Sequence, residues 1–103
     1  MTIATIATAF TADAMRSLGH SVYSSAMVSW ALITSNDNEP HLLVLFREGG
    51  TVYRYAFSGW EAAREWDSIR HDEQWAAEEG EPVSWGRCFH RFVAEGDILP
   101  IAA

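Results

Sequence analysis

The sequence contains no lysine, one cysteine and three prolines in 103 residues. Because Cys88 is the only cysteine, no disulfide can form within one chain, and no multi-cysteine metal cluster is possible. No apolar run approaches the roughly 20 residues that span a bilayer, and residues 1–10 lack the basic start of a secretory signal. We therefore expect a cytoplasmic protein with no membrane segment.

All seven basic side chains are arginines, against 14 acidic side chains, and the formal charge is -7. Exclusive use of arginine fits a GC-rich genome, including a gene from a virus or mobile element of such a host, or a need for planar guanidinium groups. The acidity is local, because residues 58–81 hold eight of the acidic side chains and two arginines. This segment predicts either a solvated helix face or a surface that engages a basic host protein or mimics nucleic acid.

An apolar fraction of 49%, with five Trp and five Phe, is ample for one packed core in a chain of this length. We expect a single domain over residues 1–103. It divides into an N-terminal extension with a short helix (1–21), a core (22–93) that includes an acidic helical insertion at about 58–81, and a tail (94–103). A homo-oligomer is compatible with this composition.

Residues 42–55 carry the strongest local signal. Apolar residues on both faces of 41–47 predict a central strand covered on both sides. Gly49-Gly50 supplies a tight turn, and 51–57 returns as a second strand. The period of two then places Tyr53 and Tyr55 on one face and Arg54 on the other.

The rest of the chain predicts further elements. Alternation over 22–33 indicates a strand, and helices are expected at about 11–18, 58–79 and 84–93. Residues 98–101 form an apolar tail suited to an edge strand or to docking on a partner. The fold class is therefore α+β, with a small antiparallel meander of three or four strands packed against two or three helices.

The order of several short motifs resembles the KTSC domain, which occurs at the end of some lysyl-tRNA synthetases and as a free-standing bacterial protein. The matching pieces are Val22-Tyr-Ser-Ser25, Leu42-x-Val44-x-Phe46, Gly50, Tyr53-x-Tyr55, Ser84-x-Gly86 and Phe89. The resemblance covers roughly residues 22–93. The chain departs from the family in its longer, more acidic stretch between Tyr55 and Ser84, and in ending on Arg87-Cys-Phe-His-Arg91.

Attachment to a tRNA-handling enzyme implies RNA binding for the family, and the resemblance extends this expectation to the chain. Tyr53 and Tyr55 would stack on bases, with Trp85 closing over a planar ligand. Arg54, Arg87 and Arg91 would contact phosphate. The alternatives are that the tyrosines simply cover the sheet and that Trp85 anchors a helix.

A protein partner is the competing expectation. An inhibitor-like surface on the acidic helix would use six carboxylates, namely Glu61, Glu65, Asp72, Glu73, Glu78 and Glu79. Such a surface would engage a basic partner rather than nucleic acid.

Enzymatic chemistry has no matching residue set. Cys88 and His90 are two helix positions apart and therefore diverge, and Ser24-Ser25 has no His and acid at a recognisable motif spacing. The four histidines are scattered without metal-ligand spacing. We therefore predict no catalytic residue, no metal and no cofactor.

Overall fold

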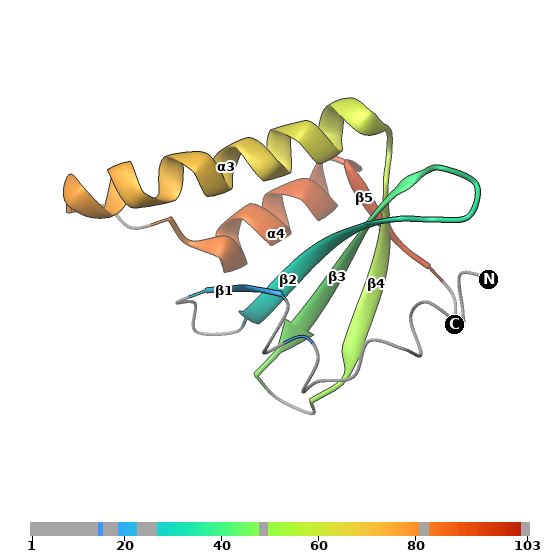
Figure 1. Cartoon of the computed structure of the whole chain (residues 1–103), viewed down its shortest axis with the longest axis horizontal. Coiled ribbons are helices and arrows are strands. Elements are labelled where there is room, and N and C mark those ends of the chain that lie inside the picture. Colours follow the sequence, from blue (N-terminus) through green and yellow to red (C-terminus); the bar gives the residue numbers. More distant parts are fainter. Residues whose placement is uncertain (1–14, 16–18, 23–26, 48–49, 81–82, 102–103) are drawn as a thin grey trace.

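A computed structural model of the chain describes residues 15, 19–22, 27–47, 50–80 and 83–101, apart from the side chains of residues 74, 75 and 77 (Figure 1). The elements run in the order β1 (His20–Ser21), β2 (Met27–Thr34), β3 (Pro40–Phe46), β4 (Val52–Phe57), α3 (Trp60–Glu78), α4 (Trp85–Ala94) and β5 (Ile98–Pro100). The helix predicted at about 11–18 lies outside the described residues, except for Met15.

The five strands form one antiparallel sheet in the sequential order β1-β2-β3-β4-β5. This arrangement confirms the α+β class and the meander, but the sheet has five strands where three or four were expected. The additional strand is β1, whose two residues are too short to show an alternating pattern. Both edge strands, β1 and β5, come from residues outside 22–93.

The central strand β3 is buried on both faces, as its apolar pattern predicted. Leu42 and Val44 belong to the main core beneath the helices. Leu43 and Leu45 point the other way and pack with Met15. Figure 1 shows α3 and α4 on the same side of the sheet.

Three tryptophans form the centre of the main core. The ring centroids of Trp30, Trp66 and Trp85 lie 5.0 to 5.7 Å apart, and each side chain is at most 2% exposed. The indole N–H groups of Trp30 and Trp66 have no hydrogen-bond partner within the described part of the chain. Burial of large aromatic rings therefore dominates the packing between the helices and the sheet.

Local hydrogen bonds set the start of α3 and join it to the sheet. Ala63 donates its backbone N–H to the carbonyl of Gly59 at 3.3 Å, so the first helical bond begins one residue after Ser58. The Ser58 N–H instead donates to the carbonyl of Asp97 at 2.8 Å, which ties the end of β4 to the start of β5. The helix predicted from 58 to 79 thus spans Trp60–Glu78.

At its C-terminus, α4 turns directly into β5. Gly96 has a φ of 74°, which L side chains rarely adopt, and its N–H donates to the carbonyl of Val93. The Asp97 N–H donates to the carbonyl of Phe92, which completes a Schellman motif. This turn directs the tail into β5, and the edge-strand prediction for that segment is confirmed. Among the described helices, none is long and apolar enough to cross a bilayer.

Candidate functional site

The two predicted tyrosines lie on the helix-facing side of β4, where four aromatic rings form a continuous cluster. We call Phe46, Tyr53, Tyr55 and Phe89 the tyrosine patch. The ring of Tyr53 lies 5.8 Å from that of Phe46, which lies 5.3 Å from Phe89. Tyr55 contacts Phe89 edge to face at 5.1 Å. The patch therefore joins β3, β4 and α4.

Within the patch, Tyr53 is the accessible ring. It is 47% exposed, whereas Tyr55 is half-buried and Phe89 is buried. Burial raises the pKa of the Tyr55 hydroxyl, and the neighbouring Tyr53 adds to this effect. The Tyr55 hydroxyl therefore stays a neutral donor near neutral pH, and the patch presents the ring of Tyr53 to solvent.

Arg54 faces away from the tyrosines, as the alternation of β4 predicted. Its side chain is 7% exposed and donates from Nε to Nδ1 of the buried His41 at 2.9 Å. Burial lowers the pKa of His41, and the charge of Arg54 lowers it further. A ligand stacked on Tyr53 therefore lies on the opposite side of the sheet from Arg54.

Trp85 is part of the core and is only 1% exposed. Its indole N–H donates to Oε2 of Glu73, whose carboxylate also lies 3.2 Å from Nε2 of His20. In this arrangement Trp85 anchors α4 against α3, in line with the alternative hypothesis that it anchors a helix. Its ring has no free face for a ligand.

The two arginines of α4 are exposed but lie apart from the patch. Arg87 and Arg91 are each two positions from Phe89, so at about 100° per residue both project from the solvent side of the helix while Phe89 faces the sheet. The guanidinium carbon of Arg91 lies 5.5 Å from the ring centroid of Phe92. The closer neighbours of the patch are His90, with its ring 5.8 Å from Phe89, and Val93, one turn beyond Phe89.

No protein-family model, curated protein or solved structure matches the chain. The resemblance to KTSC domains thus stays a prediction that rests on the order of its short motifs.

The acidic residues of α3 do not form one surface. Glu61, Glu65 and Asp72 are exposed and lie on one side of the helix, and we call them the acidic stripe. Glu79 follows the helix end, and Glu78 lies on another side, six residues beyond Asp72. Glu73 is half-buried and bonded internally to His20 and Trp85. No residue of the acidic stripe forms an ion pair with another described residue.

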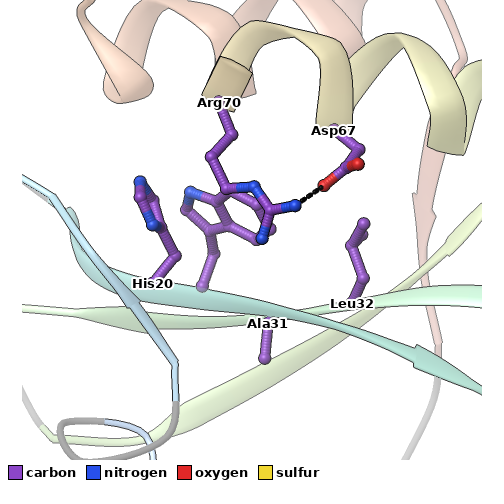
Figure 2. Close-up of a pocket in the computed structure, with 6 residues that line it drawn as sticks. His20, Ala31, Leu32, Asp67 and Arg70 are labelled. Atoms are coloured by element: carbon purple, nitrogen blue, oxygen red, sulfur yellow. Dashed lines mark ion pairs between the residues drawn. The ribbon is translucent and has the colours of Figure 1, made fainter. Parts of the chain in front are cut away.

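A cavity that the sequence did not indicate lies beside β2, near the edge of the sheet that is opposite β5. Its volume is about 270 Å³, and its lining comes from β1, β2 and α3. In Figure 2, Asp67 and Arg70 extend from α3 toward the sheet, where His20 and Leu32 project upward. The Arg70 guanidinium pairs with the Asp67 carboxylate at 3.1 Å. These residues are far apart in sequence, so no local motif could indicate the cavity.

Proposed function

We propose that this protein is a non-enzymatic, cytoplasmic binding module, similar to KTSC domains, that takes up a nucleotide or a short single-stranded nucleic acid on the tyrosine patch. The exposed ring of Tyr53 carries this proposal. A base stacks on that ring, and Tyr55 supports the site from within the cluster. Arg87 and Arg91 contact phosphates of a strand that continues around α4, while Arg54 and Trp85 take no direct part.

Preorganisation supports the stacking role of Tyr53. Its ring is held against Phe46, which packs on Phe89, so little side-chain freedom remains to be lost when a base binds. Stacking on an aromatic side chain contributes about 1 to 3 kcal/mol per base. The contribution is similar for all bases, so the proposal specifies single-stranded ligands without a sequence preference.

The negative charge of α3 limits the length of a suitable ligand. At physiological salt, exposed charges are screened over about 8 Å, whereas a helix of 19 residues is roughly 28 Å long. Repulsion therefore acts on a long polyanion that passes the acidic stripe but little on a ligand confined to the patch. We expect short oligonucleotides to bind more favourably per phosphate than long ones.

The direct test uses fluorescence anisotropy with labelled oligouridylate and oligothymidylate of roughly eight nucleotides, a length within the site sizes of single-strand binders. Tyr53→Leu is expected to weaken binding about 5-fold or more, the loss that corresponds to one stacked base. Tyr53→Phe keeps the ring and is expected to bind like the wild type. Neutralising Arg87 and Arg91 together should reduce the dependence of affinity on salt.

A matched control is Trp60→Leu. Trp60 is 44% exposed, close to the value for Tyr53, but lies at the start of α3 and outside the patch. This variant should leave oligonucleotide affinity unchanged. If folded Tyr53→Leu binds as tightly as the wild type, or if the wild type binds neither oligonucleotide, the stacking proposal is wrong.

The acidic stripe favours a second candidate function, namely capture of a basic protein by an inhibitor-like module encoded by a virus or mobile element. Three exposed carboxylates on one helix side, without described ion-pair partners, form a compact negative surface suited to this role. The test replaces Glu61, Glu65 and Asp72 by Lys and measures capture of basic proteins from host lysate. Glu78→Lys controls for a charge reversal on another side of α3. Capture that survives the triple reversal would exclude the stripe as the interface.

A further inference from the structure

The sheet has one edge that no described strand completes. β1 pairs with β2 only at His20 opposite Trp30 and Ser21 opposite Ser29. On the N-terminal side of β1, the Gly19 N–H donates to the carbonyl of Met15 at 2.9 Å, and Met15 packs with Leu43 and Leu45 on the face of the sheet away from the helices. The outer edge of β2 from residue 31 to Thr34 therefore has no strand beside it in the described part of the chain.

Hydrogen-bond alternation identifies which backbone groups face this free edge. Ser35 donates its N–H to the carbonyl of Glu39 across the hairpin. The backbone N–H and C=O groups of the odd-numbered residues in this part of β2 therefore point toward β3. On the other side, Val22 donates to the carbonyl of Val28 toward β1. The N–H and C=O groups of Leu32 and Thr34 therefore point outward from the free edge.

The opposite edge of the sheet differs. β5 has only three residues and ends at Pro100, which has no N–H to offer to another strand. Short edge strands and proline are common devices against unwanted strand pairing. Within the described residues, the free edge of β2 carries no proline and no charged side chain from 31 to 34. As far as the described strands show, strand addition is thus blocked at β5 and open at β2.

The cavity of about 270 Å³ lies directly along this free edge. In Figure 2 the Ala31 methyl points away from α3, so Ala31 lines the cavity through its backbone, while the Leu32 side chain projects into the same region. Asp67 and Arg70 neutralise each other at 3.1 Å on the α3 side. An added strand would therefore have space for a side chain in surroundings that are aromatic and aliphatic and carry a balanced charge.

We propose that the free edge of β2 binds an extended, apolar and uncharged peptide segment of a partner protein as an additional strand in line with β1. Its backbone pairs with the outward groups of Leu32 and Thr34, and one of its side chains enters the cavity beneath α3. Main-chain pairing supplies the affinity and the cavity supplies the side-chain preference. The balanced Asp67–Arg70 pair favours an aliphatic side chain over a charged one.

The position of α3 favours a peptide segment over a second copy of this chain. Antiparallel pairing of two copies along this edge would place both helical layers on the same side of the joined sheet. Asp67 and Arg70 line the cavity from α3 at that edge, so the α3 helices of the two copies would meet there. A lone strand brings no helix and avoids this contact.

The experiment uses capped peptides of roughly eight residues, the usual length of a strand, that alternate Thr with Val, Leu or Lys. We expect the Val and Leu peptides to bind, and to slow hydrogen exchange of the Leu32 and Thr34 amides about 5-fold or more. The Lys peptide should bind at least about 5-fold more weakly. N-methylation of alternate nitrogens in the Val and Leu peptides should abolish binding, since it removes the pairing edge of the peptide.

Two variants at one exposed position complete the test. Thr34→Pro removes an outward N–H without removing a β2–β3 hydrogen bond, and should weaken peptide binding about 5-fold. Thr34→Val keeps that N–H and should bind like the wild type. The proposal is overturned if the Lys peptide binds best, if N-methylated peptides bind equally well, or if Leu32 and Thr34 become protected by self-association without peptide. If Thr34→Pro does not fold, the N-methylated peptides still decide the question.

Discussion

Glu73 is the residue whose replacement most directly tests how the two helices are held together. Its carboxylate accepts a hydrogen bond from the indole N–H of Trp85 on α4 and lies 3.2 Å from Nε2 of His20 on β1. One side chain thus connects α3 to both α4 and the edge of the sheet. Glu73→Ala removes this acceptor and leaves the donor of Trp85, which is 1% exposed, without a partner.

The cost follows from the burial of each partner. An unsatisfied buried donor costs about 1 to 3 kcal/mol. The side chain of His20 is 27% exposed and can form a hydrogen bond with water instead. Loss of its contact with Glu73 therefore adds less than about 1 kcal/mol. We expect Glu73→Ala to lower the free energy of unfolding by about 2 kcal/mol, equivalent to a fall in Tm of roughly 8 to 16 °C for a domain of this size.

Urea unfolding of Glu73→Ala, Trp85→Phe and the double variant measures this contribution. Trp85→Phe removes the donor, so Glu73→Ala should cost about 1 kcal/mol less in that background than in the wild type. Glu73→Gln keeps an acceptor oxygen and should cost less than Glu73→Ala. Glu65→Ala, an exposed position on the same helix, should change stability by less than about 0.5 kcal/mol. Additive single variants, or a cost for Glu73→Ala as small as that of Glu65→Ala, would refute the reasoning.

Other predictions follow from the close packing at Gly19 and from the buried His41. A Cβ on Gly19 would lie 2.6 Å from the carbonyl oxygen of Met15. Gly19→Ala should therefore lower the free energy of unfolding in urea by about 1 to 3 kcal/mol. Gly59→Ala, whose Cβ would lie in open space, should not lower it. Burial and the charge of Arg54 lower the pKa of His41 in the folded chain from the ordinary value of 6.5. As pH falls below about 6.5, His41 therefore binds a proton in the unfolded chain before it does so in the folded chain. The free energy of unfolding should therefore decrease as pH falls through this range. Urea unfolding at about pH 7.5 and about pH 5.5 should show a smaller decrease for His41→Gln than for the wild type. An equal decrease in both proteins would contradict the assignment to His41.

Much of the sheet could be predicted because its signals are local. The apolar residues on both faces of 41–47 required a covered central strand, and β3 is buried on both sides. The alternation of 51–57 separated Arg54 from Tyr53 and Tyr55, and the structure keeps them on opposite faces. Each of these features depends on residues within about ten positions of one another.

Contacts between segments that are distant in sequence could not be predicted from local sequence patterns. Trp85 was expected either to close over a planar ligand or to anchor a helix, and its position is set by Glu73 on another helix and by His20 on β1. The acidic run of α3 suggested one surface, yet Glu73 is half-buried because its partners are Trp85 in the core and His20 on the edge strand β1. Phe46 and Phe89, which support the tyrosines, join the patch only because β3 and α4 meet there.

The tyrosine patch and the free edge of β2 are separate surfaces, so their functions can be tested independently. Tyr53 lies on β4, two strands from β2, and neighbouring strands are spaced about 4.8 Å apart, which puts roughly 10 Å of sheet between them. Val44 of β3 lies between Tyr53 and Trp30 in the register and is fully buried. A change at Tyr53 therefore alters no group at the free edge, and Thr34→Pro alters none at the patch. A variant of either residue that weakened both oligonucleotide and peptide binding would indicate a loss of folded protein rather than the loss of one site.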